Sequence, residues 1–370
     1  MPTMYAAFVA LVLALLALDL GVFHRKAHVV SVKEALGWSA FWIVLGVAFV
    51  AVIYAGYENH WMGLGLTPDR MSTAEAVAGV GTVYNDGTSA AVKYLTGYVV
   101  EKSLAVDNIF VIAMVFGFFA VPAIYQHRVL FWGIVGALLM RGGMIALGAK
   151  LLSEFGWIIY VFGGFLILTG VKMLLLPEHG IDPDKNVVVR LTRRLFPVTE
   201  RFHGAHFFVR AGSRASHEAE QPGMAELPDR VVDAARAGTL LATPLLLALV
   251  MVEFTDLVFA VDSIPAIFAI TADPFLVFTS NVFAILGLRS LYFALAGMIQ
   301  AFRYLKVSLA AVLMVVGVKM MTHGWLKGLL GPSYNLYTLG VVFLILAAGV
   351  VASVLASRRE RRDAPGSAAA

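Results

Sequence analysis

Hard oxygen donors lie in two long apolar stretches of this sequence, where charged side chains are costly. Carboxylate, amide and hydroxyl oxygens suit Mn²⁺, Ca²⁺ or Mg²⁺ better than Cu⁺ or Zn²⁺, which favour thiolate or imidazole ligands. The two stretches therefore predict a site for a hard divalent cation. Its predicted ligands are Glu101, Asp107, Asn108, Glu253, Asp256 and Asp262, with Ser103, Thr255 and Ser263 in support.

Helical geometry decides which of these side chains can meet. At about 100° per residue, Glu253 and Asp256 lie about 60° apart, whereas Asp262 points away from Glu253 on a straight helix. Pro265 removes a backbone donor and disfavours helical geometry at Ile264. We therefore expect a helix break near residues 262–265 that turns Asp262 back toward the other acids and exposes carbonyl oxygens.

Structural ion pairing is the alternative explanation for the buried acids. Lys102, Arg141 and Arg289 could pair with them permanently, or act as counter-charges when the site is empty. Lys172 and Lys319 stand near predicted helix ends, where we expect their ammonium groups to reach the membrane surface.

Composition identifies the elements that must hold these residues. The 370-residue chain is 60% hydrophobic and only 14% charged, whereas a soluble domain carries about 25% charged residues. This excludes a disordered chain, a secreted disulfide scaffold and an ordinary cytosolic enzyme. There is no cysteine, and neither an HExxH nor a GxSxG motif is present, so we expect no enzyme activity. The fold class is an all-α polytopic membrane protein.

Nine stretches are long and apolar enough to cross a bilayer. Lys and Arg concentrate in the odd-numbered loops and the tail, so the N-terminus is expected outside and the C-terminus in the cytoplasm. A bacterial inner membrane is the expected location, and nucleic acid is not an expected partner. The predicted spans are about 4–23, 36–57, 92–118, 129–149, 156–176, 240–269, 275–300, 304–322 and 335–356.

Three landmarks recur along the chain at nearly constant offset. They are Asp107, Arg141 and Lys172 in the first copy and Asp256, Arg289 and Lys319 in the second. Each copy spans three predicted helices, so consecutive copies enter the membrane from opposite sides and form an inverted repeat, as in many transporters. The predicted divisions are 1–88, repeat one at 89–176, a cytosolic loop at 177–239, repeat two at 240–323, and helix nine with a basic tail at 324–370.

The long 177–239 loop carries both acidic and basic residues and could serve as a docking surface. His203 and His206 stand three residues apart in it and could bind a regulatory metal. Two histidines in a soluble loop are more often structural, and this is the alternative explanation for the pair.

The segments EKSLAVDN at 101–108 and EFTDLVFAVDSIPA at 253–266 resemble the TerC/Alx family, which is named for tellurium resistance. The resemblance extends to RFHG at 201–204, FFVR at 207–210 and SNVFAILGLRS at 280–290, and covers nearly the whole chain. It implies a LysE-like membrane protein that exports Mn²⁺. It also implies that some members supply metal near the secretion machinery.

The family's acidic membrane positions fall on Glu101, Asp107, Glu253, Asp256 and Asp262. The resemblance implies direct Mn²⁺ ligation by the three aspartates, with the glutamates as ligands or proton acceptors. We expect a secondary transporter in the lipid bilayer, since no Walker motif is present, with proton coupling as one option. The alternatives are a metal-binding partner of a secretion or stress-response complex, and a cation channel.

Overall fold

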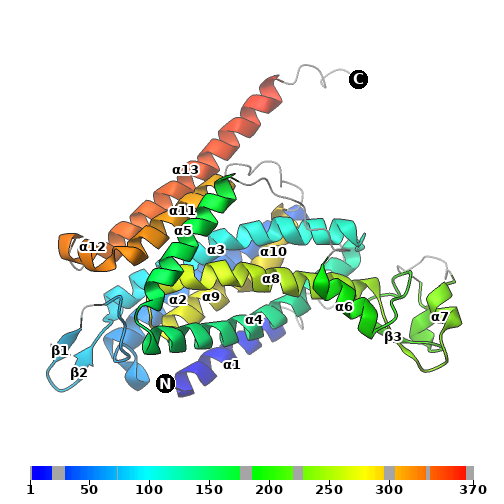
Figure 1. Cartoon of the computed structure of the whole chain (residues 1–370), viewed down its shortest axis with the longest axis horizontal. Helices are drawn as coiled ribbons and strands as arrows, with labels where there is room; N and C mark the ends of the chain where they lie inside the picture. The colour runs from blue at the N-terminus through cyan, green and yellow to red at the C-terminus, as the bar shows by residue number, and fades with distance from the viewer. Residues whose placement is uncertain are drawn as a thin grey trace.

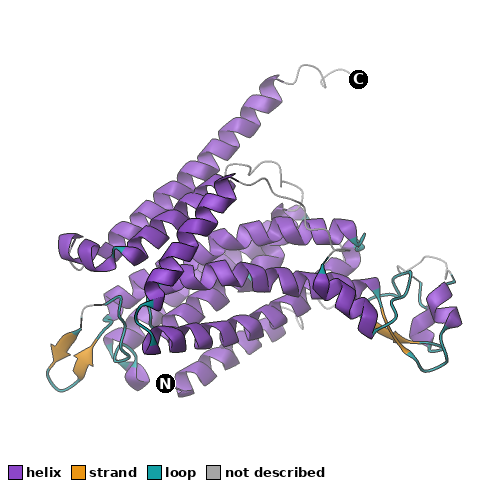
Figure 2. Cartoon of the chain, viewed as in Figure 1, coloured by secondary structure: helices purple, strands orange, loops and turns teal. Residues whose placement is uncertain are grey.

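The computed structural model describes residues 2–18, 30–72, 74–175, 186–219, 228–295, 305–330 and 334–363. Helices make up most of this structure, and four short strands form two antiparallel pairs, β1 with β2 and β3 with β4 (Figure 2). The predicted all-α class is therefore confirmed. The predicted first and seventh loops, the 177–239 loop and the basic tail lie wholly or partly outside the described residues.

The element bounds follow the apolar stretches closely. The helices are α1 (Pro2–Leu18), α2 (Val32–Glu58), η2 (Trp61–Gly63), α3 (Gly87–Phe118), α4 (Ala123–Glu154), α5 (Ile158–Leu175), α6 (Val187–Leu195), η3 (Arg214–His217), α7 (Arg230–Ala234), α8 (Pro244–Phe268), α9 (Pro274–Leu286), α10 (Leu288–Leu295), α11 (Leu305–Met321), α12 (His323–Leu330) and α13 (Tyr334–Asp363). The strands are β1 (Glu75–Val77), β2 (Gly81–Val83), β3 (Phe208–Arg210) and β4 (Leu240–Ala242).

Six helical segments of the described chain are long and apolar enough to cross a membrane. The bent pair α11–α12, with an angle of 82° between its parts, would make a seventh. Helix α3 has the length but carries Lys93, Glu101, Lys102 and Asp107, and α1 is short. A count of nine spans therefore stays a prediction, because the eighth and ninth spans would be the charged α3 and the short α1.

Local signals explain where several helices begin. Ser31 and Asp86 accept backbone N–H groups at the starts of α2 and α3. Asp273 does the same for α9, and Pro274 follows it at the first helical position, where its missing N–H costs nothing.

Helices α5, α11 and α13 lie together at an angle to the group that contains α3, α4 and α8 (Figure 1). Small residues allow α5 and α11 to pack closely. A Cβ atom built at Gly317 would lie 2.8 Å from the carbonyl oxygen of Gly163, and one at Gly170 would lie 2.8 Å from that of Ala310. The backbones of these two helices are therefore in direct contact.

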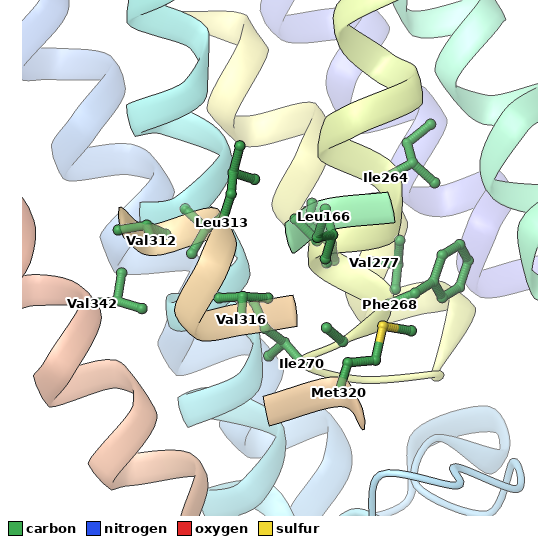
Figure 3. Close-up of a cluster of buried hydrophobic side chains, with 14 of the residues drawn as sticks. Leu166, Ile264, Phe268, Ile270, Val277, Val312, Leu313, Val316, Met320 and Val342 are labelled. Atoms are coloured by element: carbon green, nitrogen blue, oxygen red, sulfur yellow. The ribbon is translucent and has the colours of Figure 1, made fainter. Parts of the chain in front are cut away.

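A cluster of buried side chains joins the two helix groups (Figure 3). Leu166 of α5, Ile264 and Phe268 of α8, and Leu313 and Val316 of α11 belong to this cluster, and each is at most 3% exposed. We call it the apolar layer. It fixes α5 and α11 against α8, and so determines the walls of the cavity described next.

The described part of the 177–239 loop is a small folded region at one end of the molecule, and β1 and β2 lie at the other end (Figure 1). Asp229 caps α7 and also accepts the backbone N–H groups of Glu200 and Arg201. The predicted amphoteric loop is thus an ordered unit in its described part.

Candidate functional site

A cavity of about 330 Å³ lies between α3, α5, α8 and α11. Its rim residues Met114 and Lys172 are exposed, whereas Glu101, Arg141 and Leu313 at its inner end are buried. The polar and charged residues in its wall are Glu101, Asp107, Asn108, Arg141, Thr169, Lys172, Asp262, Ser263 and Lys306. We call this space the acidic cavity.

One face of α3 forms a wall of the acidic cavity. Glu101, Leu104, Asp107, Val111 and Met114 follow one another at intervals of three or four residues, which places them along one side of a helix. This face passes from the buried Glu101 to the exposed Met114. Glu101 and Asn108, seven residues apart on this helix, both line the cavity.

Helix α8 supplies the opposite wall, and here the predicted helix break is wrong. Helix α8 runs unbroken from Pro244 to Phe268, with the buried Pro265 inside it. Tight packing in the apolar layer holds the residues around Pro265 in helical geometry, although Pro265 cannot donate a backbone hydrogen bond. Asp262 therefore reaches the cavity from a continuous helix, and no carbonyl is freed by a break.

Arg141 of α4 is the centre of the buried end of the cavity. Its Nη2 donates to Asp256 Oδ1 at 3.0 Å and its Nε to Asp256 Oδ2 at 3.3 Å, a two-point contact. Its Nη1 pairs with Glu101 and donates to Asn281 Oδ1 at 2.7 Å and to Ser263 Oγ at 3.4 Å. The guanidinium thus bridges carboxylates from α3 and α8.

Asn108 Nδ2 lies 3.4 Å from Asp256 Oδ1, which adds a second residue of α3 to the same group. Arg141 is 3% exposed and Asp256 is 9% exposed. A charge at this depth persists only with a partner, and one guanidinium faces two carboxylates here. Arg141 is therefore the shared ion-pair partner of Glu101 and Asp256.

Asp262 lies in the half-buried part of the cavity. It accepts a hydrogen bond from Thr169 Oγ1 of α5 at 3.1 Å, and it interacts electrostatically with Lys172 one turn further along α5. Lys172 is exposed, as predicted, and it also lines the rim of the cavity. Lys319, by contrast, does not reach a surface: it is 4% exposed and donates to Asn335 Oδ1 at 3.0 Å.

Glu253 lies outside the acidic cavity. It is nine residues before Asp262 on a continuous helix and so points the opposite way. Its carboxylate lies against Gly136 of α4, where any side chain would overlap it. Glu253 Oε2 is buried and has no hydrogen-bond partner among the described residues. The predicted Glu253 is therefore not among the residues that line the cavity.

The other predicted site residues occupy different places. Lys102 Nζ donates to the carbonyl of Ala284 on α9 at 3.0 Å. Ser103 and Thr255 donate to carbonyls of their own helices, at 2.7 and 2.8 Å. Arg289 lines a small void of about 20 Å³ next to Asn108 and Asp256. Of the predicted counter-charges, Arg141 lies between two of the acids.

The two loop histidines face different carboxylates. His203 Nε2 lies 3.5 Å from Asp229 Oδ2 and is buried, whereas His206 Nε2 lies 3.1 Å from Glu218 Oε2 and is exposed. Within the described ranges, no group of three or more His, Cys, Asp or Glu side chains is arranged to hold a metal ion. This holds for the two histidines, and it holds equally for the predicted acidic ligands, which the described structure does not gather into a ready-made metal cluster.

Asn281 and Thr169 are site residues that the sequence did not single out. Both stand in segments that belong to recurring or family-like motifs, but neither is charged. Asn281 contacts Arg141 across 140 positions of sequence, and Thr169 contacts Asp262 across 93. The packing of α9 on α4 brings Asn281 to Arg141, and the packing of α5 on α8 brings Thr169 to Asp262.

The family model for the TerC family of integral membrane proteins matches residues 86–361, which include every acidic residue of the cavity. The chain belongs to the TerC family. No solved structure matches it.

Relatives in this TerC family cover almost the whole chain. The uncharacterized membrane protein STKORF319 of Myxococcus xanthus is 46% identical over 96% of this chain and 93% of its own. Alx of Escherichia coli K12, provisionally named a membrane-bound redox modulator, is 39% identical over 99% of this chain and 98% of its own. Alx of Salmonella typhi is 40% identical over 95% and 93%.

Proposed function

We propose that this TerC protein is a secondary transporter that exports a hard divalent cation, with Mn²⁺ as the first candidate. The observation that carries the proposal is Arg141, which holds Glu101 and Asp256 together at the buried end of a cavity that also contains Asp107 and Asp262. An internal cation stands where a transported cation would bind.

An incoming cation would take over the carboxylates that Arg141 bridges. Glu101 and Asp256 come from different helices, so a divalent ion between them would need Arg141 to withdraw toward Asn281 and Ser263, which it already contacts. Asp107, Asn108 and Asp262 would supply further oxygen ligands. When the ion leaves, Arg141 returns, and this exchange keeps the site from being left with uncompensated buried charge.

The inverted repeat belongs to the same proposal. Helix α3 packs on α9, as α8 packs on α4, and α5 packs on α11. These pairings are those expected if α3, α4 and α5 correspond to α8, α9 with α10, and α11. With the predicted orientation, the exposed rim at Met114 and Lys172 faces the cytoplasm. The structure would then be the form that loads its cation from inside.

Proton exchange is the proposed driving force. Carboxylates that release a metal can take up protons, so an inward proton gradient would favour loss of the metal outside. Glu253, buried beside α4 and outside the cavity, is the proposed proton acceptor.

The provisional name of the Alx relatives suggests a second candidate, an effect on redox state. This chain has no cysteine, so a redox effect could not come from a thiol–disulfide couple of its own. Metal export could produce it indirectly. A metal-binding partner of a secretion or stress-response complex remains the alternative if no flux is found.

Flux of Mn²⁺ in proteoliposomes tests the proposal. Purified protein would be reconstituted with Mn²⁺ on one side and a pH gradient imposed or collapsed. We expect Mn²⁺ flux that follows the gradient and is lost in Asp256→Asn. Glu154→Gln is the matched control, because Glu154 is an exposed acid whose partner is Lys150 on the surface of α4. Normal flux in Asp256→Asn would refute the assigned site.

A further inference from the structure

A second polar cavity, of about 160 Å³, lies at the opposite end of α3 from the rim of the acidic cavity. It is bounded by the β1–β2 hairpin, the start of α3 and the start of α13, and by the predicted orientation it faces outside. We call it the vestibule. Its lining residues are Met71, Ser72, Glu75, Val83, Tyr84, Asp86, Ser89, Tyr334 and Asn335.

Below the vestibule lies a buried network centred on Asp69. Lys93 Nζ of α3 pairs with Asp69 Oδ2 at 2.9 Å and also bonds Ser72, a vestibule residue. Asp69 further accepts from Thr271 Oγ1 at 2.6 Å and from the backbone N–H of Ala272 at 2.9 Å. The network therefore ties the α2–α3 loop to α3 and to the α8–α9 turn.

Asp273 belongs to the same network. Asn85 Nδ2 lies 3.1 Å from Asp69 Oδ2 and 3.5 Å from Asp273 Oδ2, and Tyr57 of α2 donates to Asp273 Oδ2 at 2.9 Å. Burial alone would raise the pKa of Asp69. The charge of Lys93 and several hydrogen bonds outweigh burial and lower this pKa to well below its ordinary value. Burial and then the charge of Asp69 raise the pKa of Asp273 to about 6.

Helices α11 and α13 close the remaining side. Tyr334 donates its hydroxyl to the carbonyl of Met71 at 2.8 Å, and Lys319 bonds Asn335. Lys319 also lies 4.8 Å from the centre of the Tyr334 ring and interacts electrostatically with Lys93 and Asp69. Elements from both proposed repeats thus meet in one buried set of polar contacts around the Lys93–Asp69 ion pair. We call this set, from Asp69 to Asn335, the Asp69 network.

The side chains of the apolar layer (Figure 3) adjoin both the acidic cavity and the Asp69 network. Leu313 belongs to this layer and also lines the acidic cavity. At its other side, Ile270 and Met71 belong to the layer and directly precede Thr271 and Ser72. Along α3, Lys93 and Glu101 are eight residues apart, which is about 12 Å. Vestibule, Asp69 network, apolar layer and acidic cavity therefore follow one another across the protein.

We propose that the Asp69 network and the apolar layer form the outer gate of the transport path, and that the vestibule is the mouth through which a divalent cation leaves. The identity of the transported ion rests on the proposed function, whereas the existence of a closed barrier between the vestibule and the acidic cavity does not. An exit from the acidic cavity toward the vestibule requires the contacts of Lys93, Thr271 and Lys319 to separate together.

The charge of the vestibule fits a cation exit. Glu75 and Asp86 contribute carboxylates to its wall, and its described lining contains no Lys or Arg. The Asp69 network repeats the arrangement at Arg141, because Lys93 occupies the oxygen ligands of Asp69, Asn85 and Ser72 as an internal cation. A closed gate filled by a tethered ammonium would exclude free cations from this layer.

The chain has no cysteine, so single-cysteine variants test the gate without background. Val111→Cys reports on the acidic cavity, and Ser89→Cys reports on the vestibule. Right-side-out and inverted membrane vesicles would be treated with a membrane-impermeant thiol reagent. We expect Ser89→Cys to react only from outside and Val111→Cys only from inside.

Asp69→Asn keeps the shape of the side chain but removes the charge that Lys93 faces. Because breaking a buried pair is strongly destabilising, we expect external labelling of Val111→Cys to rise about tenfold or more in this background. Thr271→Val removes one hydrogen bond and should raise the external labelling of Val111→Cys less. Lys150→Met, an exposed change on α4, is the control and should leave it unchanged.

Internal labelling of Val111→Cys at its normal rate shows that a variant is folded. If Asp69→Asn does not fold, external labelling in the Thr271→Val background tests the gate instead. External labelling of Val111→Cys as fast as that of Ser89→Cys in the starting chain would overturn the proposal. So would unchanged external labelling in both gate variants. Labelling requires no metal flux, so a chain that transports nothing can still support the gate, and a chain that transports Mn²⁺ can still refute it.

Discussion

Replacing Arg141 with methionine tests the exchange of an internal cation for a metal ion. Methionine fills a similar volume and removes the three polar contacts to Glu101 and Asp256. Disruption of a buried ion pair costs about 3–5 kcal/mol. If about 3 kcal/mol of this opposes metal binding in the native chain, removal of Arg141 strengthens binding about a hundredfold, since each 1.4 kcal/mol is about tenfold.

Binding and flux should therefore change in opposite directions. We expect Arg141→Met to bind Mn²⁺ about a hundredfold more tightly at pH 8 and to transport it at least about tenfold more slowly, because nothing replaces the metal as it leaves. Isothermal titration in detergent measures the first quantity and proteoliposome flux the second. Arg141→Lys retains the charge but loses the two-point contact with Asp256, and should lie between the native protein and Arg141→Met.

A structural role for Arg141 predicts a different result. Arg141→Met would then bind Mn²⁺ more weakly or not at all, with a lowered melting temperature and no gain in affinity at any pH. Unchanged affinity in a folded Arg141→Met protein would likewise refute the exchange, since the metal would then not compete with the guanidinium.

Four further predictions follow from the geometry. Thr169→Val should weaken Mn²⁺ binding a few-fold, about 1 kcal/mol, because Asp262 loses its hydrogen-bond donor, and titration would detect this. Lys102→Met should leave Mn²⁺ affinity within about twofold, because Lys102 bonds a carbonyl of α9 and not the acids; a larger loss would place it in the site. Gly317→Ala should lower stability by about 1–3 kcal/mol by forcing α5 and α11 apart, with Gly164→Ala as the neutral control in a thermal melt, and equal melting temperatures would contradict the close packing. Asp273 faces Tyr5, Tyr57 and Asp69, and its pKa is raised to about 6, so the closed gate holds a proton that an exposed Asp273 would lose. Its contribution to closure is greatest below about pH 4 and declines as pH rises to about 6, by about 3 kcal/mol in all. External labelling of Val111→Cys, normalised to Ser89→Cys, should rise over that range in the native background and stay flat in Asp273→Asn.

The residue types in the sequence predicted which side chains line the acidic cavity better than they predicted how those side chains are oriented. Glu101, Asp107, Asn108, Asp262 and Ser263 all line one cavity because hard oxygen donors in apolar helices have few other places to go. The orientation of side chains on α8 was less predictable. Pro265 suggested a break, but the apolar layer holds α8 straight, and this sends Glu253 to α4 and Asp262 to the cavity.

Long-range contacts explain what the sequence could not show. Asp69 meets Thr271 across 202 positions, and Tyr57 meets Asp273 across 216. Lys319 was predicted to reach the membrane surface, yet both Lys319 and Lys93 are buried in the Asp69 network. A single sequence indicates that such residues are unusual in an apolar setting, but only the packing of α3, α11 and α13 identifies their partners.

Electron paramagnetic resonance of Mn²⁺ bound to the purified protein tests the central claim most directly. The account predicts saturable Mn²⁺ binding with oxygen ligands alone, lost in Asp256→Asn and in Asp262→Asn and retained in Glu154→Gln. Saturable binding that survives both aspartate variants, or a signal with coupling to imidazole nitrogen, would contradict the account and place the metal away from the acidic cavity.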